Sequence, residues 1–179
     1  MKLGVGKNTS SDSRESGRFC HLLSQKQIEG RIVMGRVLEM EWPEIGIKVE
    51  AEPLPFNQDF YDYFLDNLPL KGIQSHGVVS GKILYIMNLK LAKYPPRRYL
   101  ELKMEDLSEE PVGRVSIFIT SGRVGSIMVK YGEITEPMSY PTIAQVRESD
   151  IGRLVQAGEA EWQSLYRTKE IISVIYRAK

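Results

Sequence analysis

The chain has 179 residues, of which 42% are hydrophobic, and its 24 basic and 23 acidic side chains nearly cancel. This length allows one domain with a sizeable core. The interspersed charges give no footprint for nucleic acid or an anionic membrane surface. A single cysteine, Cys20, excludes an intrachain disulfide framework and a cysteine-rich zinc site. No apolar run reaches the roughly 20 residues that span a bilayer, so we expect a cytoplasmic protein without nucleic-acid or membrane partners.

The amino-terminal region differs in composition from the rest. We expect residues 1–30 to form a flexible extension, because its stretch GKNTSSDSRESG is too polar to bury much apolar surface. Residues 4–10 are similar to a phosphate-binding loop but lack the strand before it and the helix after it. Cys20 and His21 are adjacent there, which does not reliably lower the pKa of a thiol. Residues 31–179 form the predicted domain.

The first part of this domain predicts a hairpin and a helix. Residues 31–40 and 45–51 carry apolar side chains in alternation and flank a turn at Pro43, which is typical of a β-hairpin. Residues 57–68 then predict a short amphipathic helix, with Asn57 as its N-cap. Its apolar face is formed by Phe60, Tyr61, Phe64, Leu65 and Leu68.

The middle of the chain is rich in strand-like segments. Residues 72–79 and 82–91 predict two strands or one bent strand, and the other predicted strands cover residues 112–120, 125–132 and 141–146. Ser80 and Gly81 mark the turn or bulge between the first two. We expect residues 92–110 to form an irregular connection.

The last third predicts a helix followed by a strand. Ser149 suits an N-cap, and the apolar face of the following helix contains Leu154 and Trp162. Residues 170–177 predict a buried strand. Two short helices among seven or eight strands favour a mainly β protein, a closed antiparallel barrel of about eight strands capped by two α-helices. The first helix would cover one rim of the barrel with Phe60 and Phe64. The second helix would cover the opposite rim with Leu154 and Trp162.

Four features of the chain resemble a bacterial cyclophilin-like domain family of unknown function. They are a helix ending in Leu-Pro, the string SHGVVSGKILYI at residues 75–86, the string IMVKYG at residues 127–132, and a final helix before an isoleucine-rich strand. The resemblance covers residues 35–177 and implies one β-barrel of about eight strands capped by two helices. It does not imply prolyl isomerisation. True cyclophilins carry Phe-His-Arg, whereas His76 is followed by Gly77.

His76 and Ser80 are the first candidate site residues. A nucleophilic serine needs a base within hydrogen-bond reach, and adjacent strand residues such as Ser75 and His76 point to opposite faces. Ser80 would share the face of His76 only in a regular strand. The favoured interpretation makes these turn and strand residues, with His76 half-exposed. The alternative places His76 in the wall of a ligand pocket.

Tyr131, Glu133 and Arg123 complete the candidate ligand-binding set. Tyr131 ends a strand and Glu133 begins a loop, where barrels often place ligand contacts; the alternative is a capping aromatic and a solvated acid. Arg123 lies in a turn and is either a ligand contact or a surface cation. Two widely separated histidines and no clustered acids predict neither a metal site nor a cofactor.

The leading hypothesis is a protein that binds a small molecule or a peptide-like ligand in a surface cleft, without prolyl-isomerase activity. An enzyme or accessory subunit in amide or urea metabolism is the alternative, by analogy with cyclophilin-like modules of amide-cleaving hydrolases. Prolyl isomerisation is a second alternative, and whether the chain is an enzyme stays open. A homo-oligomer is a further alternative, with a surface patch formed by Trp42, Tyr61, Tyr63 and Tyr94.

Overall fold

The computed structural model describes residues 36–179, apart from the side chain of Thr120. The predicted extension, its phosphate-loop-like string, the Cys20-His21 pair and the start of the first predicted strand lie outside the described residues. None of the helices between residues 36 and 179 is long and apolar enough to cross a membrane.

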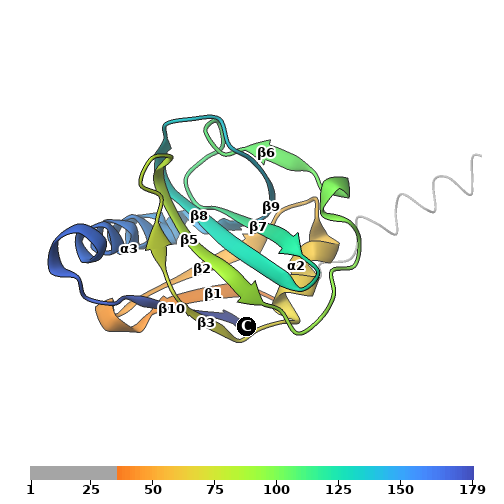
Figure 1. Cartoon of the computed structure of the whole chain (residues 1–179), viewed down its shortest axis with the longest axis horizontal. Coiled ribbons are helices and arrows are strands. Elements are labelled where there is room, and N and C mark those ends of the chain that lie inside the picture. Colours follow the sequence, from red (N-terminus) through yellow and green to blue (C-terminus); the bar gives the residue numbers. More distant parts are fainter. Residues whose placement is uncertain (1–35) are drawn as a thin grey trace, which may run out of the picture. The chain divides into compact units, whose positions relative to one another are not determined.

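The described part of the chain has ten antiparallel strands, nine of which form a nearly closed barrel (Figure 1). Nine follow the path β3-β10-β1-β2-β9-β7-β8-β5-β4, and β6 pairs with β9. The two ends of the path, β3 and β4, are consecutive in the chain and separated only by Gln74. The predicted mainly β, antiparallel barrel is therefore confirmed. The strands are β1 (Leu38–Trp42), β2 (Ile47–Pro53), β3 (Leu70–Ile73), β4 (Ser75–His76), β5 (Gly81–Lys90), β6 (Met104–Asp106), β7 (Arg114–Ser121), β8 (Val124–Ile134), β9 (Ser139–Val146) and β10 (Ser173–Ala178).

Two α-helices lie at opposite ends of this barrel, as Figure 1 shows. They are α2 (Gln58–Leu65) and α3 (Ile151–Gln163), and a π-helical turn, η4 (Ser164–Thr168), continues α3. Single 3-10 turns complete the structure: η1 (Pro43–Ile45), η2 (Tyr99–Glu101) and η3 (Glu148–Asp150). Both predicted helices thus exist, although α2 ends three residues earlier than predicted.

The predicted helix caps differ from those in the structure. Asn57 does precede α2, but its side-chain amide donates to the carbonyls of Lys103 and Thr142 at 2.9 and 3.0 Å instead of capping the helix. Ser149 lies within η3, and Asp150 is the residue immediately before α3. Asn57 therefore ties the start of α2 to β9 and to the residue that precedes β6, which a local pattern cannot reveal.

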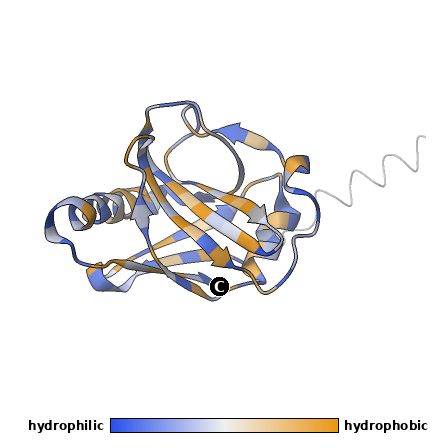
Figure 2. Cartoon of the chain, in the orientation of Figure 1, coloured by the Kyte–Doolittle hydropathy of each residue, from blue (hydrophilic) through white to orange (hydrophobic). Residues whose placement is uncertain are grey.

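The barrel interior is the main hydrophobic core, and hydrophobic and hydrophilic residues alternate along its strands (Figure 2). Phe60 and Phe64 of α2 are fully buried in it, as is Leu154 of α3. Burying a side chain of this size contributes about 1.5–3 kcal/mol. Trp162, predicted to cover the same rim as Leu154, is partly buried and packs against His76 outside this core.

The segment predicted to be irregular, residues 92–110, contains η2 and the short strand β6. It also contributes Leu107, which packs with Ile83 and Ile134 in a second, smaller cluster. Ile83 is on β5, where its neighbour Leu84 belongs to the barrel core. Because successive strand side chains point to opposite faces, the second cluster lies on the outer face of the barrel wall.

Candidate functional site

His76, at the end of β4, is buried with 2% of its surface exposed. Its Nδ1 lies 2.7 Å from the carbonyl oxygen of Gly77, and its Nε2 contacts the hydroxyl of Tyr131 on β8. A carbonyl can only accept, so Nδ1 carries the proton and Nε2 accepts from the tyrosine. The interpretation of His76 as half-exposed is wrong, because Tyr131 and α3 cover the ring.

Both ring nitrogens of His76 are therefore engaged within the protein. Burial lowers the pKa of His76, although the Gly77 carbonyl and the charge of Glu159 act in the opposite direction. Burial also raises the pKa of Tyr131. At neutral pH the pair is a neutral imidazole and a neutral phenol, which provides a fixed aromatic wall and leaves no ring nitrogen available to act as a base toward a ligand.

A cavity of about 200 Å³ opens beside this pair, and we call it the His76 cavity. Trp162 of α3 stands edge-on to the His76 ring, with 4.8 Å between ring centroids, and Tyr166 packs behind it at 4.2 Å. Such edge-to-face pairs contribute about 0.5–1.5 kcal/mol beyond their buried area. The cavity is lined by His76, Gly77, Val78, Gly81, Lys82, Tyr131, Glu159 and Trp162.

One cation and one anion line the same cavity. Lys82 Nζ lies 2.6 Å from Glu159 Oε1, and the two side chains are 51% and 45% exposed. Lys82 Nζ is also 5.9 Å from the centroid of the Tyr131 ring. The His76 cavity thus combines aromatic walls with opposite charges that solvent can reach.

Two glycines make room for these side chains. A methyl group on Gly158, in the middle of α3, would overlap the ring of Tyr131. A methyl group on Gly132, on β8, would overlap the aliphatic stem of Lys82. Gly158 therefore allows α3 to approach the barrel wall closely, and this approach forms one side of the cavity.

A second cavity of about 210 Å³ lies on the other side of the loop that joins β4 to β5, and we call it the methionine cavity. Gly77 borders both cavities, whereas Val78 lines only the first and Ser80 only the second. The methionine cavity is lined by Gly77, Ser80, Ile83, Tyr85, Met87, Phe118, Ser126, Met128, Met138 and Tyr140.

The five predicted site residues do not form one site. His76 and Tyr131 meet in the first cavity, and Ser80 borders the second, where its hydroxyl donates to Glu136 at 2.9 Å. Arg123 lines neither cavity; it donates to the carbonyl of Ala92 at 2.8 Å. Glu133 is exposed and lines neither.

Sequence reasoning missed Lys82 and Glu159 and assigned Trp162 only to the helix face that covers one rim of the barrel. One signal was available, since Glu159 and Trp162 are three positions apart and such helical residues share a face. Lys82 gave no signal, because it precedes a buried run and reads as a solvated strand residue.

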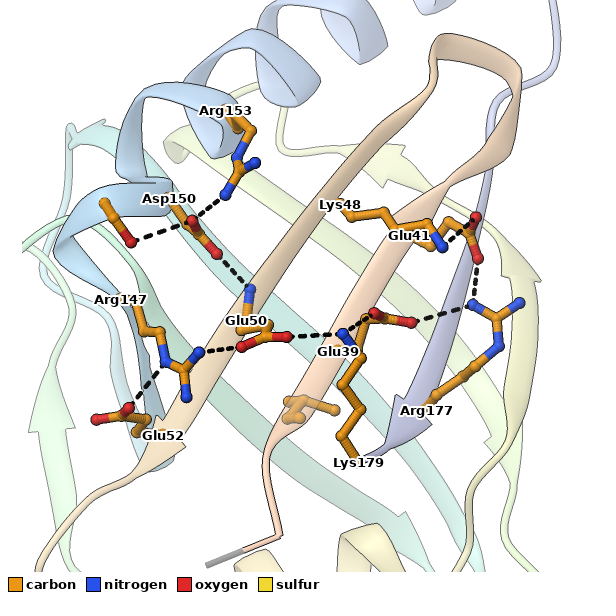
Figure 3. Close-up of polar contacts among 12 residues, drawn as sticks. Glu39, Glu41, Lys48, Glu50, Glu52, Arg147, Asp150, Arg153, Arg177 and Lys179 are labelled. Carbon is orange, nitrogen blue, oxygen red and sulfur yellow. Dashed lines mark hydrogen bonds and ion pairs between the residues drawn. The ribbon is translucent and has the colours of Figure 1, made fainter.

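A third hollow, of about 380 Å³, is charged rather than aromatic. It is lined by Ser149, by the acids Glu39, Glu50 and Asp150, and by the bases Lys48, Arg147, Arg153 and Lys179. Figure 3 shows the ion pairs of this region, which continue beyond the hollow through Glu41, Glu52 and Arg177. Every charged residue of the lining is in an ion pair within the protein, so an ionic ligand would have to displace a protein partner.

Within residues 36–179 no group of three or more histidine, cysteine, aspartate or glutamate side chains could hold a metal ion. The proposed oligomer patch also changes. Trp42, Tyr61 and Tyr63 are at most 7% exposed, so only Tyr94 of the four residues is available at the surface.

Comparisons with known proteins identify similar solved structures. Among them is McbB in complex with tryptophan, with 31% sequence identity and a TM-score of 0.65. The similarity covers 78% of this chain but only 44% of McbB, so this chain spans less than half the length of that protein. No family model and no curated protein matches the sequence. The cyclophilin-like resemblance stays a prediction.

Proposed function

We propose that this protein binds a small aromatic molecule that carries both a cationic and an anionic group, such as an aromatic amino acid, in the His76 cavity. The observation that carries the proposal is the Lys82–Glu159 pair in a cavity with aromatic walls. The tryptophan bound to McbB, a protein similar over 78% of this chain, supports a ligand of this class.

The chemistry of the cavity matches the two ends of such a ligand. The ammonium group of Lys82 pairs with the ligand carboxylate, and the carboxylate of Glu159 pairs with the ligand ammonium. The ligand ring packs against Trp162. Opening the Lys82–Glu159 pair costs little, because an ion pair between half-exposed side chains contributes about 0–1 kcal/mol.

Isothermal titration calorimetry with three related ligands tests the proposal. We expect L-tryptophan to bind more tightly than tryptamine, which lacks the carboxylate, and than indole-3-propionate, which lacks the ammonium. Lys82→Met should remove the higher affinity for L-tryptophan relative to tryptamine. Glu159→Gln should remove the higher affinity for L-tryptophan relative to indole-3-propionate. Lys93→Met is the matched control, because Lys93 forms a similar exposed pair with Asp66 at 2.9 Å, far from the cavity lining.

Two outcomes would contradict this assignment. One is the absence of heat from all three ligands at millimolar concentration. The other is binding of tryptophan that Lys82→Met and Lys93→Met weaken equally, since the effect would then be one of net charge.

The proposal includes the absence of prolyl-isomerase activity. Two features support this part: His76 uses both ring nitrogens within the protein, and Arg123 binds a backbone carbonyl away from the His76 cavity. Turnover in a proline-peptide assay that His76→Ala or Arg123→Ala abolished would contradict it.

A further inference from the structure

The methionine cavity differs from the His76 cavity in its chemistry. Its walls are aliphatic, thioether and aromatic side chains, and no charged residue lines it. Phe118 and Tyr140 form one aromatic edge, with 5.8 Å between ring centroids at a near-perpendicular angle. Transfer of an ion into such surroundings is costly, so the lining favours a neutral ligand.

Ser126, on β8, is the unusual member of this lining. Only 5% of its surface is exposed, and its Oγ has no hydrogen-bond partner within the described protein. A buried hydroxyl without a partner costs about 1–3 kcal/mol. A ligand that offers Ser126 one hydrogen-bonding group would remove this cost.

Methionine side chains make the rest of the wall adaptable. Met87, Met128 and Met138 line the cavity, and Met87 is 60% exposed at its opening. Unbranched thioethers adjust to apolar ligands of different shape and contact aromatic rings favourably. The cavity is therefore suited to a flat ring of modest size.

We propose that the methionine cavity is a second ligand site, which takes a neutral aromatic ring with one hydrogen-bonding group and holds that group at Ser126. This site does not depend on the function proposed for the His76 cavity. The loop from Gly77 to Ser80 separates the two cavities, so the two ligands would lie on either side of one short segment.

Methyl NMR on the full chain, with ¹³C at the methionine methyl groups, tests the site with indole as the probe. Indole is neutral and has one N–H, and its carbocyclic analogue indene has the same shape without it. Indole should shift the signals of Met87, Met128 and Met138 in a saturable way. Met40, in the barrel core, and Met104, on β6, do not line the cavity and serve as internal references.

Ser126→Ala separates the hydrogen bond from simple apolar binding. This substitution should weaken indole binding by roughly 2- to 10-fold, the range of one hydrogen bond, and leave indene binding unchanged. An unshifted Met40 signal verifies that the variant is folded.

The proposal is overturned if indole leaves the three signals unmoved up to its solubility limit, or if it moves Met104 as much as Met128. It is also overturned if Ser126→Ala affects indole and indene equally. Tryptophan should not displace indole from these methyl groups, because its charges do not suit an uncharged cavity.

Discussion

At the scale of single residues, the buried carboxyl group of Glu161 stands out. This side chain is only 3% exposed, and its Oε1 has no hydrogen-bond partner within residues 36–179. Burial, together with the charge of Glu44, raises the pKa of Glu161 to about 7. Glu161 lines none of the three hollows. Its effect should therefore appear in folding stability rather than in ligand binding.

We predict that Glu161→Gln stabilises the protein at pH 8 and changes little at pH 4. Below pH 4.5, the usual value for this group, the carboxyl is protonated in both folded and unfolded chains. Between pH 4.5 and about 7 the unfolded chain has lost this proton while the folded chain keeps it, so the folded state loses about 3 kcal/mol of stability as the pH rises across this range. A neutral amide avoids this loss. Urea unfolding at the two pH values measures the difference.

Glu159→Gln is the matched control for this prediction, because Glu159 lies on the same helix with a half-exposed side chain. If the two substitutions gave the same change at pH 8, net charge rather than burial would explain it. An unchanged stability of Glu161→Gln at pH 8 would also contradict the prediction.

We also predict that the pKa of His76 is below 6.5, as followed by NMR of its ring carbon. Its burial favours the neutral ring, so the contribution of His76 to stability is present above pH 6.5 and is lost as the pH falls. Tyr131→Phe removes the hydroxyl that Nε2 accepts from and should change the titration. A His76 pKa above 6.5 would contradict the inferred tautomer and burial.

Strand alternation predicted that Ser75 and His76 point to opposite faces of the sheet. It could not predict which of the two faces is the inner one. Gly77 and Gly81 interrupt the strand, so register could not be extended across the loop. Tyr131, the partner of His76, is 55 positions away in the sequence. The contact that buries His76 therefore depends on how β8 passes β4, which no local pattern contains.

At the scale of elements, α3 contains two glycines in contrasting environments. Gly152 is exposed, and a methyl group there would meet nothing within 4 Å. Gly158 is buried against the ring of Tyr131. Glycine has a low helix propensity at either position, and only the packing distinguishes the two.

We predict opposite effects for alanine at these two positions. Gly152→Ala should raise the free energy of unfolding by about 0.5–1 kcal/mol, the helix preference of alanine over glycine. Gly158→Ala should lower it by about 1–3 kcal/mol through overpacking against Tyr131. Urea unfolding measures both, and stabilisation of the protein by Gly158→Ala would show that α3 can move away from the barrel freely.

Most elements could be predicted because their patterns are local. The period of 3.6 residues in α2 and α3 and the alternation in β2 and β8 are visible in the sequence. The strand β6 was missed, because three residues, Met104, Glu105 and Asp106, are too few to show an alternating pattern, and the strand forms by pairing with β9. The final strand begins three residues late, because η4 and the left-handed Lys169 continue past α3.

At the scale of the whole molecule, a closed barrel could be predicted from the composition and the order of the elements. The order in which the strands pair around the barrel could not. The pairing of β1 with β10 joins residues near opposite ends of the described chain. The ion pairs in Figure 3 add contacts between these two strands, since Arg177 on β10 pairs with Glu39 and Glu41 on β1. Such pairs could not be assigned from interspersed charges in the sequence, because every acid has several candidate partners.

Asp150 connects β2 to the start of α3. Its Oδ2 accepts from the backbone N–H of Glu50 on β2 at 2.8 Å, and its Oδ1 contacts Arg153. Burial acts to raise the pKa of Asp150, but these hydrogen bonds and the cation outweigh it and lower the pKa below 3.8. The stability that the carboxylate contributes is thus present above pH 3.8 and is lost as the pH falls further.

We predict that Asp150→Asn lowers the free energy of unfolding at pH 7 by about 1–3 kcal/mol, because asparagine cannot accept from Arg153 as a charged carboxylate does. The difference from the unsubstituted protein should shrink as the pH falls below 3.8, because the stability that the carboxylate contributes is lost there. Urea unfolding between pH 2 and pH 7 measures this convergence, with the exposed Asp62→Asn as the control. A loss that stayed constant down to pH 2 would mean that shape rather than charge at position 150 holds α3 against β2.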